Sequence, residues 1–299
     1  KTAYEIRLSL VGSEMCIRDS SQGDGNNAAD VFAVALRGAG PVNPTGAWYD
    51  PAQDGHGLQV QLIAGNRLLA FWYTFDPAGN RAYFIGDGAF DGNSATLTNL
   101  RPVGTFFPPN FNSSQLTLQP FGTMRLQFDS CSAGNVSFDL PQGFGQGSMR
   151  LTRLTQPAGV NCGTTPTTTA TGPIAAATGA WYNPATDGQG LVLESLSGGL
   201  LLATWYTQGP SPTGGQSWFT GVGTINGNQA LINMTIVDGG RFIPNFNPAA
   251  IVRRTFGAMT LHIDSCSAGN VSWSFGDGYG NGSMPLTRIT TPAGVVCTP

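Results

Sequence analysis

The sequence predicts an all-β protein made of two tandem eight-stranded antiparallel barrels. The chain repeats itself, since residues 45–49 (TGAWY) recur letter for letter at 178–182 and residues 129–137 (DSCSAGNVS) recur at 264–272. Short apolar runs alternate with polar residues, which is the period of strands and not of helices. Forty-two glycines, with only 10% charged residues, favour tight turns over amphipathic helices. A repeat of this size predicts a whole domain.

Within one repeat, turn residues separate eight apolar runs. The first strand, at the repeated Trp-Tyr, stops at Pro51, and Asp54-Gly55 makes the turn to the second. Gly65-Asn66 separates the second from the third, and residues 76–80 (DPAGN) separate the third from the fourth. The predicted strands are 48–49, 57–63, 68–75, 82–86, 95–100, 124–128, 136–140 and 149–154. Sequential antiparallel strands form a meander, and closing it removes the sheet edges.

Two features favour the alternative fold, a pair of β-sandwiches. Pro285 falls inside the last predicted strand, where it cannot donate to a ladder. The loops 105–114 and 240–247 are also long for a meander.

The predicted domain boundaries follow from the repeats. The barrels are expected at 45–162 and 178–299, joined by a Thr/Pro-rich linker at 163–177 that we expect to be extended and exposed. Residues 1–20 resemble a translated sequencing adaptor, so we interpret them as a non-native artefact. Residues 21–44 are interpreted as the remnant of a truncated upstream domain or linker.

The opening of each repeat resembles a known family. Gly46-Ala47-Trp48, repeated at 179–181, resembles the Gly-x-Trp of the first strand in calycins such as avidins and lipocalins. The resemblance implies a barrel whose last strand supplies an arginine that packs on the tryptophan, here Arg153 on Trp48 and Arg288 on Trp181. The Trp-Tyr-Asn-Pro and Gly-x-Gly openings also resemble tandem repeats of secreted proteobacterial proteins of unassigned function.

Four cysteines occur as two equivalent pairs. Even numbers at matched spacings predict one disulfide in each repeat, Cys131–Cys162 and Cys266–Cys297. The spacing does not fit a zinc site, because there is no CxxC and the chain has only two histidines. Disulfides predict a secreted or cell-surface protein.

The sequence offers no catalytic constellation, and we expect no cofactor and no metal. The two histidines, His56 and His262, stand at non-equivalent positions in the repeats. A net charge of −3 without a basic patch argues against nucleic acid as a partner, and no apolar run is long enough for a transmembrane helix.

Aromatic side chains are the best candidates for binding. Tyr83 and Trp218 stand on the strand face opposite their phenylalanine neighbours, and Trp72 and Trp205 lie on a face shared with aliphatic residues. We therefore predict a non-catalytic extracellular binding or adhesion module, for a carbohydrate, another surface polymer or a small apolar ligand. The alternatives are a structural repeat that self-assembles into a stalk or fibre, and the tethering appendage of a lost catalytic domain.

Overall fold

The computed structural model describes residues 42–162 and 172–297, which belong to one compact unit. The interpretations of residues 1–20, of most of 21–44 and of 163–171 concern residues outside that part. Within it, no helix is long and apolar enough to cross a membrane.

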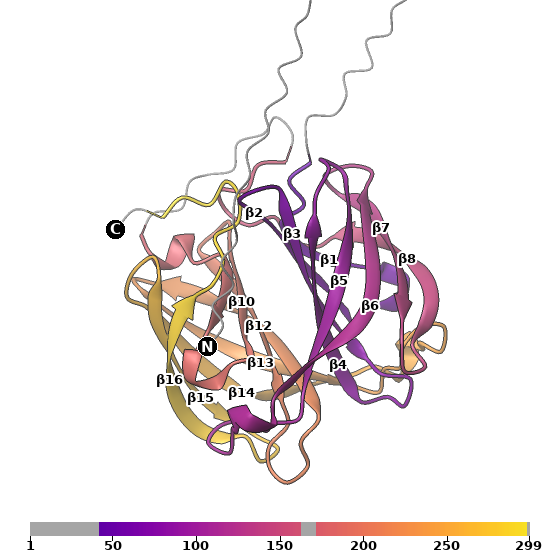
Figure 1. The fold of residues 1–299 in the computed structure, drawn as a ribbon. Coiled ribbons are helices and arrows are strands. Elements are labelled where there is room, and N and C mark those ends of the chain that lie inside the picture. Colours follow the sequence, from indigo (N-terminus) through magenta and orange to yellow (C-terminus); the bar gives the residue numbers. More distant parts are fainter. Residues whose placement is uncertain (1–41, 163–171, 298–299) are drawn as a thin grey trace, which may run out of the picture. The chain divides into compact units, whose positions relative to one another are not determined.

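Two closed eight-stranded antiparallel barrels form, as predicted (Figure 1). Barrel 1 contains β1 Gly46–Tyr49, β2 Gly57–Ile63, β3 Arg67–Phe75, β4 Arg81–Ala89, β5 Ser94–Val103, β6 Thr117–Phe128, β7 Ala133–Leu140 and β8 Gly145–Arg153. Barrel 2 contains β9 Gly179–Tyr182, β10 Gly190–Leu196, β11 Leu200–Gln208, β12 Gln216–Asn226, β13 Gln229–Asp238, β14 Val252–Ile263, β15 Ala268–Phe275 and β16 Gly280–Arg288. The described 3-10 turns are η1 Pro51–Gln53, η2 Ser113–Gln115, η3 Ile174–Ala176, η4 Pro184–Thr186 and η5 Pro248–Ala250.

The features that favoured a sandwich are accommodated by the barrel. β9 is short and pairs with β16 only through Thr287 and Arg288. Pro285 therefore lies beyond the end of β9. On the side of the strand that faces β9 it has no ladder partner, so its missing N–H costs no hydrogen bond there.

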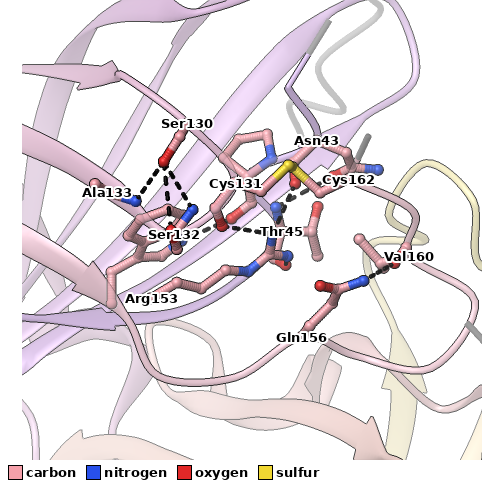
Figure 2. Close-up of a disulfide and its surroundings, with 12 residues drawn as sticks. Asn43, Thr45, Ser130, Cys131, Ser132, Ala133, Arg153, Gln156, Val160 and Cys162 are labelled. Atoms are coloured by element: carbon pink, nitrogen blue, oxygen red, sulfur yellow. Dashed lines mark hydrogen bonds between the residues drawn. A yellow bond between two sulfur atoms is a disulfide. The ribbon is translucent and has the colours of Figure 1, made fainter. Parts of the chain in front are cut away.

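Each barrel closes where its first strand pairs with its last. Trp48 stands opposite Arg153 in the β1–β8 register, and the guanidinium carbon lies 5.6 Å from the indole centroid. The same guanidinium donates to the carbonyl oxygens of Thr45 and Cys131, as Figure 2 shows. In barrel 2, Arg288 lies over Trp181 at the same distance of 5.6 Å. The contact that the calycin resemblance implied is present in both barrels.

Both predicted disulfides are confirmed. Cys131 bonds to Cys162 and Cys266 bonds to Cys297, so each tail that follows the last strand is tied to the turn before the seventh strand of its barrel (Figure 2). Cys131 also lies beside the closure, because its carbonyl accepts from Arg153.

The final residues of the predicted linker are packed and not exposed. Ile174 and Ala177 are at most 1% exposed and belong to the core of barrel 2. The carbonyl of Ala177 also accepts from the indole nitrogen of Trp181 at 2.8 Å. For this part of 163–177 the expectation of an exposed tether was wrong, because its apolar residues cap the barrel.

The two barrels contact each other through equivalent residues used reciprocally. Thr155 of the first repeat donates to Glu194 of the second, and the equivalent Thr290 donates to Gln61, the counterpart of Glu194. The Ala158 amide donates to the Ser195 carbonyl, and the Ala293 amide donates to the Leu62 carbonyl, both at 2.7 Å. Such reciprocity is the pattern of an isologous, two-fold interface.

Two equivalent glycines meet where this approximate two-fold relation brings the tails together. A Cβ on Gly159 would stand 3.1 Å from the Gly294 oxygen, and one on Gly294 would stand 2.8 Å from the Gly159 oxygen. Both residues have positive φ, 80° and 94°. Glycine is needed at both positions for backbone conformation and for close approach.

The two long loops exchange one phenylalanine each. Phe107, from the loop after β5, lies in the core of barrel 2 against Trp205, Trp273 and Tyr279 with ring centroids 4.8–5.6 Å away. The equivalent Phe242, from the loop after β13, lies in the core of barrel 1. Its ring contacts Trp72, Phe138 and Phe144 at 4.6–5.6 Å. The long loops are therefore the means by which each barrel fills the interior of the other.

This exchange predicts that the barrels unfold together. Phe242→Ala should destabilise the chain by about 3–5 kcal/mol because it leaves a cavity in the opposite barrel. Denaturant unfolding followed by tryptophan fluorescence should show one transition, shifted by either Phe107→Ala or Phe242→Ala. Phe106→Ala, at a half-buried neighbour in the same loop, is the control and should shift it much less. Two separate transitions, one of them unaffected by both core variants, would contradict this.

Candidate functional site

Two equivalent cavities lie between the barrels. The larger, of about 320 Å³, is lined by β2 and β3 of barrel 1 and by β11 to β14 of barrel 2. The smaller, of about 220 Å³, is lined by the counterparts of many of the same positions. We call them cavity A and cavity B. A third hollow of about 470 Å³ is polar and holds Arg81, Arg101, Asp76 and Asp238.

Side chains along β2 and β3 point alternately to the inner and outer faces of barrel 1, and this decides which of them reach cavity A. Leu58 and Trp72 are paired in register and point into the core of barrel 1. Their neighbours along the strands, Gln59 and Tyr73, therefore point to the outer face, toward barrel 2. Most of the remaining wall is apolar, with Leu202, Trp218 and Val237 from barrel 2.

His56 precedes β2 and lines cavity A. Its side chain is 6% exposed, its Nδ1 lies 3.1 Å from the Thr74 hydroxyl, and the Phe246 ring lies 4.8 Å away, tilted by 34°. Burial lowers the pKa of His56 to about 4. At neutral pH the imidazole is therefore uncharged.

Three polar side chains of the cavity A wall each leave one buried atom without a hydrogen-bond partner. These atoms are His56 Nε2, the Tyr73 hydroxyl and Gln59 Oε1. Desolvation raises the pKa of Tyr73 well above its usual range, so the phenol stays protonated. An unpartnered buried polar atom costs about 1–3 kcal/mol, and each of these three atoms is shielded from solvent.

A buried carboxyl group connects the cavity A wall to the interface. Glu194 accepts from Gln59 Nε2 at 2.8 Å and also from the Thr155 hydroxyl. Burial raises the pKa of Glu194, while these hydrogen bonds and the charge of Arg153 oppose the increase. The contact with Glu194 fixes the Gln59 amide, so that its oxygen is the atom left free.

Cavity B differs from cavity A at several equivalent positions. Thr204 and Thr220 of cavity A correspond to the larger Phe71 and Ile85, which reduce the space in cavity B. His56 corresponds to Gln189, and Gln59 corresponds to the buried Val192. Cavity A is therefore the larger of these two cavities, so it is the stronger candidate site.

The four aromatic residues predicted for binding lie in different surroundings and do not form one site. Trp72 and Trp205 are fully buried inside their barrels. Tyr83 is 1% exposed, and its hydroxyl donates to the Gly188 carbonyl across the interface at 2.9 Å. Of the four, Trp218 alone lines cavity A, where its ring lies 6.1 Å from Tyr73. None of the four forms an exposed platform.

Comparison with known protein families, with curated proteins and with solved structures finds no match. The described residues also contain no group of three or more His, Cys, Asp or Glu side chains placed to hold a metal ion. The functional argument therefore rests on the geometry of cavity A.

The burial of His56 predicts a specific dependence of stability on pH. The unfolded chain protonates His56 below about pH 6.5, whereas the native state does so only near pH 4. Stability therefore falls as the pH falls from 6.5 to 4, by about 3 kcal/mol for this residue at 1.36 kcal/mol per pKa unit.

The control is His56→Gln, which installs the residue of cavity B and removes the titration. The other charged side chains near the cavity, Asp54, Arg253 and Glu194, are the same in both proteins. We expect the free energy of unfolding of the wild type to fall relative to the variant between pH 7 and pH 4. Parallel pH profiles from denaturant unfolding would show that His56 is not buried as a neutral residue.

Proposed function

We propose that this chain is a non-catalytic, secreted or cell-surface binding module, and that its ligand is a small, mainly apolar molecule held in cavity A between the barrels. The observation that carries the proposal is a cavity of about 320 Å³ with a mainly apolar wall. Ligand sites are typically concave and apolar, with few polar groups that set orientation. The two disulfides support an oxidising compartment.

The packing of the barrels supports a site between them and not within them. Small eight-stranded barrels such as lipocalins bind ligands inside. Here Phe242 occupies the interior of barrel 1, and Phe107 that of barrel 2. Because each phenylalanine comes from a loop of the other barrel, a ligand inside a barrel would have to displace that loop.

The state of His56 supports binding over catalysis. A general base works best with a pKa near the operating pH. The pKa of His56 is lowered to about 4, and its Nδ1 lies against a neutral threonine hydroxyl and not a carboxylate. These features suit a fixed hydrogen-bonding group.

Two alternatives remain as second proposals. A glycan or other surface polymer would need exposed polar and aromatic groups. The polar hollow at Arg101 is the best candidate site for such a ligand. Stacking into a stalk would use exposed apolar residues such as Leu231 and Val252 on barrel 2, which are 62% and 55% exposed.

A filled cavity provides the test. The double variant Thr204→Phe/Thr220→Ile installs the residues of cavity B in cavity A and should abolish binding. A panel of small aromatic and aliphatic compounds, read by tryptophan emission and by calorimetry, should give binding to the wild type that quenches Trp218. The control variant Val222→Thr changes an exposed residue of β12 and should bind normally. Equal binding by the filled variant would contradict the proposal.

A further inference from the structure

We infer that the polar hollow at Arg101 is a second binding site, and that it takes a carboxylate surrounded by hydroxyl groups, which is the chemistry of a sugar acid. This inference rests on the second candidate of the proposed function, a glycan, and is independent of cavity A. The hollow, of about 470 Å³, is lined by the β3–β4 turn and β5 of barrel 1 and by the β11–β12 turn of barrel 2.

Arg101 stands at a position that is part of the core in the other barrel. Its equivalent in barrel 2 is Ile236, which is fully buried in the core. The Arg101 guanidinium lies over the rings of Phe121 and Phe144, 5.1 and 5.8 Å from their centroids. Partial burial of a cation costs free energy that burial of an isoleucine does not. Packing alone therefore favours isoleucine, and the arginine points to a role for its charge.

Two glutamine side chains hold the guanidinium and leave one nitrogen free. Nε donates to Gln216 Oε1 at 2.7 Å, and Nη1 donates to Gln142 Oε1 at 2.8 Å. Nη2 makes no hydrogen bond with a described residue, and it is not one of the unpartnered atoms that are shielded from solvent. Arg101 therefore presents an oriented and accessible donor, which suits a carboxylate of a ligand.

Arg101 also lacks a counter-charge. Asp238, which lines the same hollow, is paired with Arg81 and with Arg254. Arg101 itself forms no ion pair with any residue in 42–162 or 172–297. Burial lowers the pKa of Arg101, and the charge of Asp76 opposes this decrease, so the guanidinium stays protonated. A ligand carboxylate would supply the missing negative charge.

The rest of the wall requires hydrogen-bond donors beside that carboxylate. Asp76 lines the hollow, and its two oxygens accept from Asn80, each at 2.9 Å. A carboxylate has about four acceptor sites, so Asp76 can accept further hydrogen bonds. It would repel a simple acid, whereas the hydroxyls of a sugar acid can donate to it. An uncharged sugar would pair with Asp76 but would leave the charge of Arg101 unbalanced.

The test titrates the isotope-labelled full chain with glucuronate, glucose and alanine and follows the backbone amide signals by NMR. Glucuronate should shift the amides of residues 213–215, which line the hollow. It should bind on the order of tenfold more tightly than glucose, because a hydrogen bond between charged groups is stronger than one to a neutral group. Alanine, which offers an ammonium in place of hydroxyls, should bind more weakly than glucuronate.

Arg101→Ile installs the residue of barrel 2 and should remove the preference for glucuronate over glucose. The matched control is Arg150→Ile, which changes an exposed arginine of β8 outside the hollow and should keep the preference. Amide signals away from the hollow report whether a variant is folded. If Arg101→Ile is not folded, Arg101→Gln replaces it, with the same expected loss.

Four results would overturn the inference: equal affinity for glucuronate and glucose, no binding of either, alanine binding as tight as that of glucuronate, or an unchanged preference in the Arg101 variant. The double variant Thr204→Phe/Thr220→Ile should bind glucuronate normally. Loss of glucuronate binding there would place the ligand in cavity A instead of the hollow. The two sites therefore succeed or fail separately.

Discussion

The exchange of Phe107 and Phe242 is the constraint on which the rest of the structure depends. Each ring is 1% exposed and lies among aromatic residues of the barrel to which it does not belong in sequence. Without the phenylalanine ring supplied by the other barrel, each barrel would contain a cavity, and a cavity of this size costs several kcal/mol of stability. The interface is therefore part of both cores. This is why the two barrels form one structural unit and not two modules on a tether.

Duplication gives the interface its approximate two-fold symmetry, and divergence of the two copies makes its two cavities unequal. Symmetry places a cavity on each side, and Phe71 and Ile85 reduce the space in cavity B. In cavity A the smaller Thr204 and Thr220 leave room. The two cavities therefore differ in size although the approximate symmetry relates them.

The sequence was sufficient for what local patterns determine. Alternation and turn residues predicted both barrels, the matched cysteines predicted both disulfides, and the Gly-x-Trp motif predicted the contact of Trp48 with Arg153. The exchanged rings were missed because alternation assigns a face but not a partner. The signal was present, since both long loops carry Phe-x-Pro-Asn-Phe, starting at Phe107 and Phe242. His56 was missed because only one repeat has it, and its role depends on the interface.

A crystal structure of the full chain with a bound small aromatic compound tests the central claim most directly. We predict ligand density in cavity A beside Tyr73 and Trp218, with Phe107 and Phe242 in place. Density inside a barrel, in the position of Phe242, would contradict it. In that case the exchanged ring would be a displaceable plug, and the binding site would be the barrel interior.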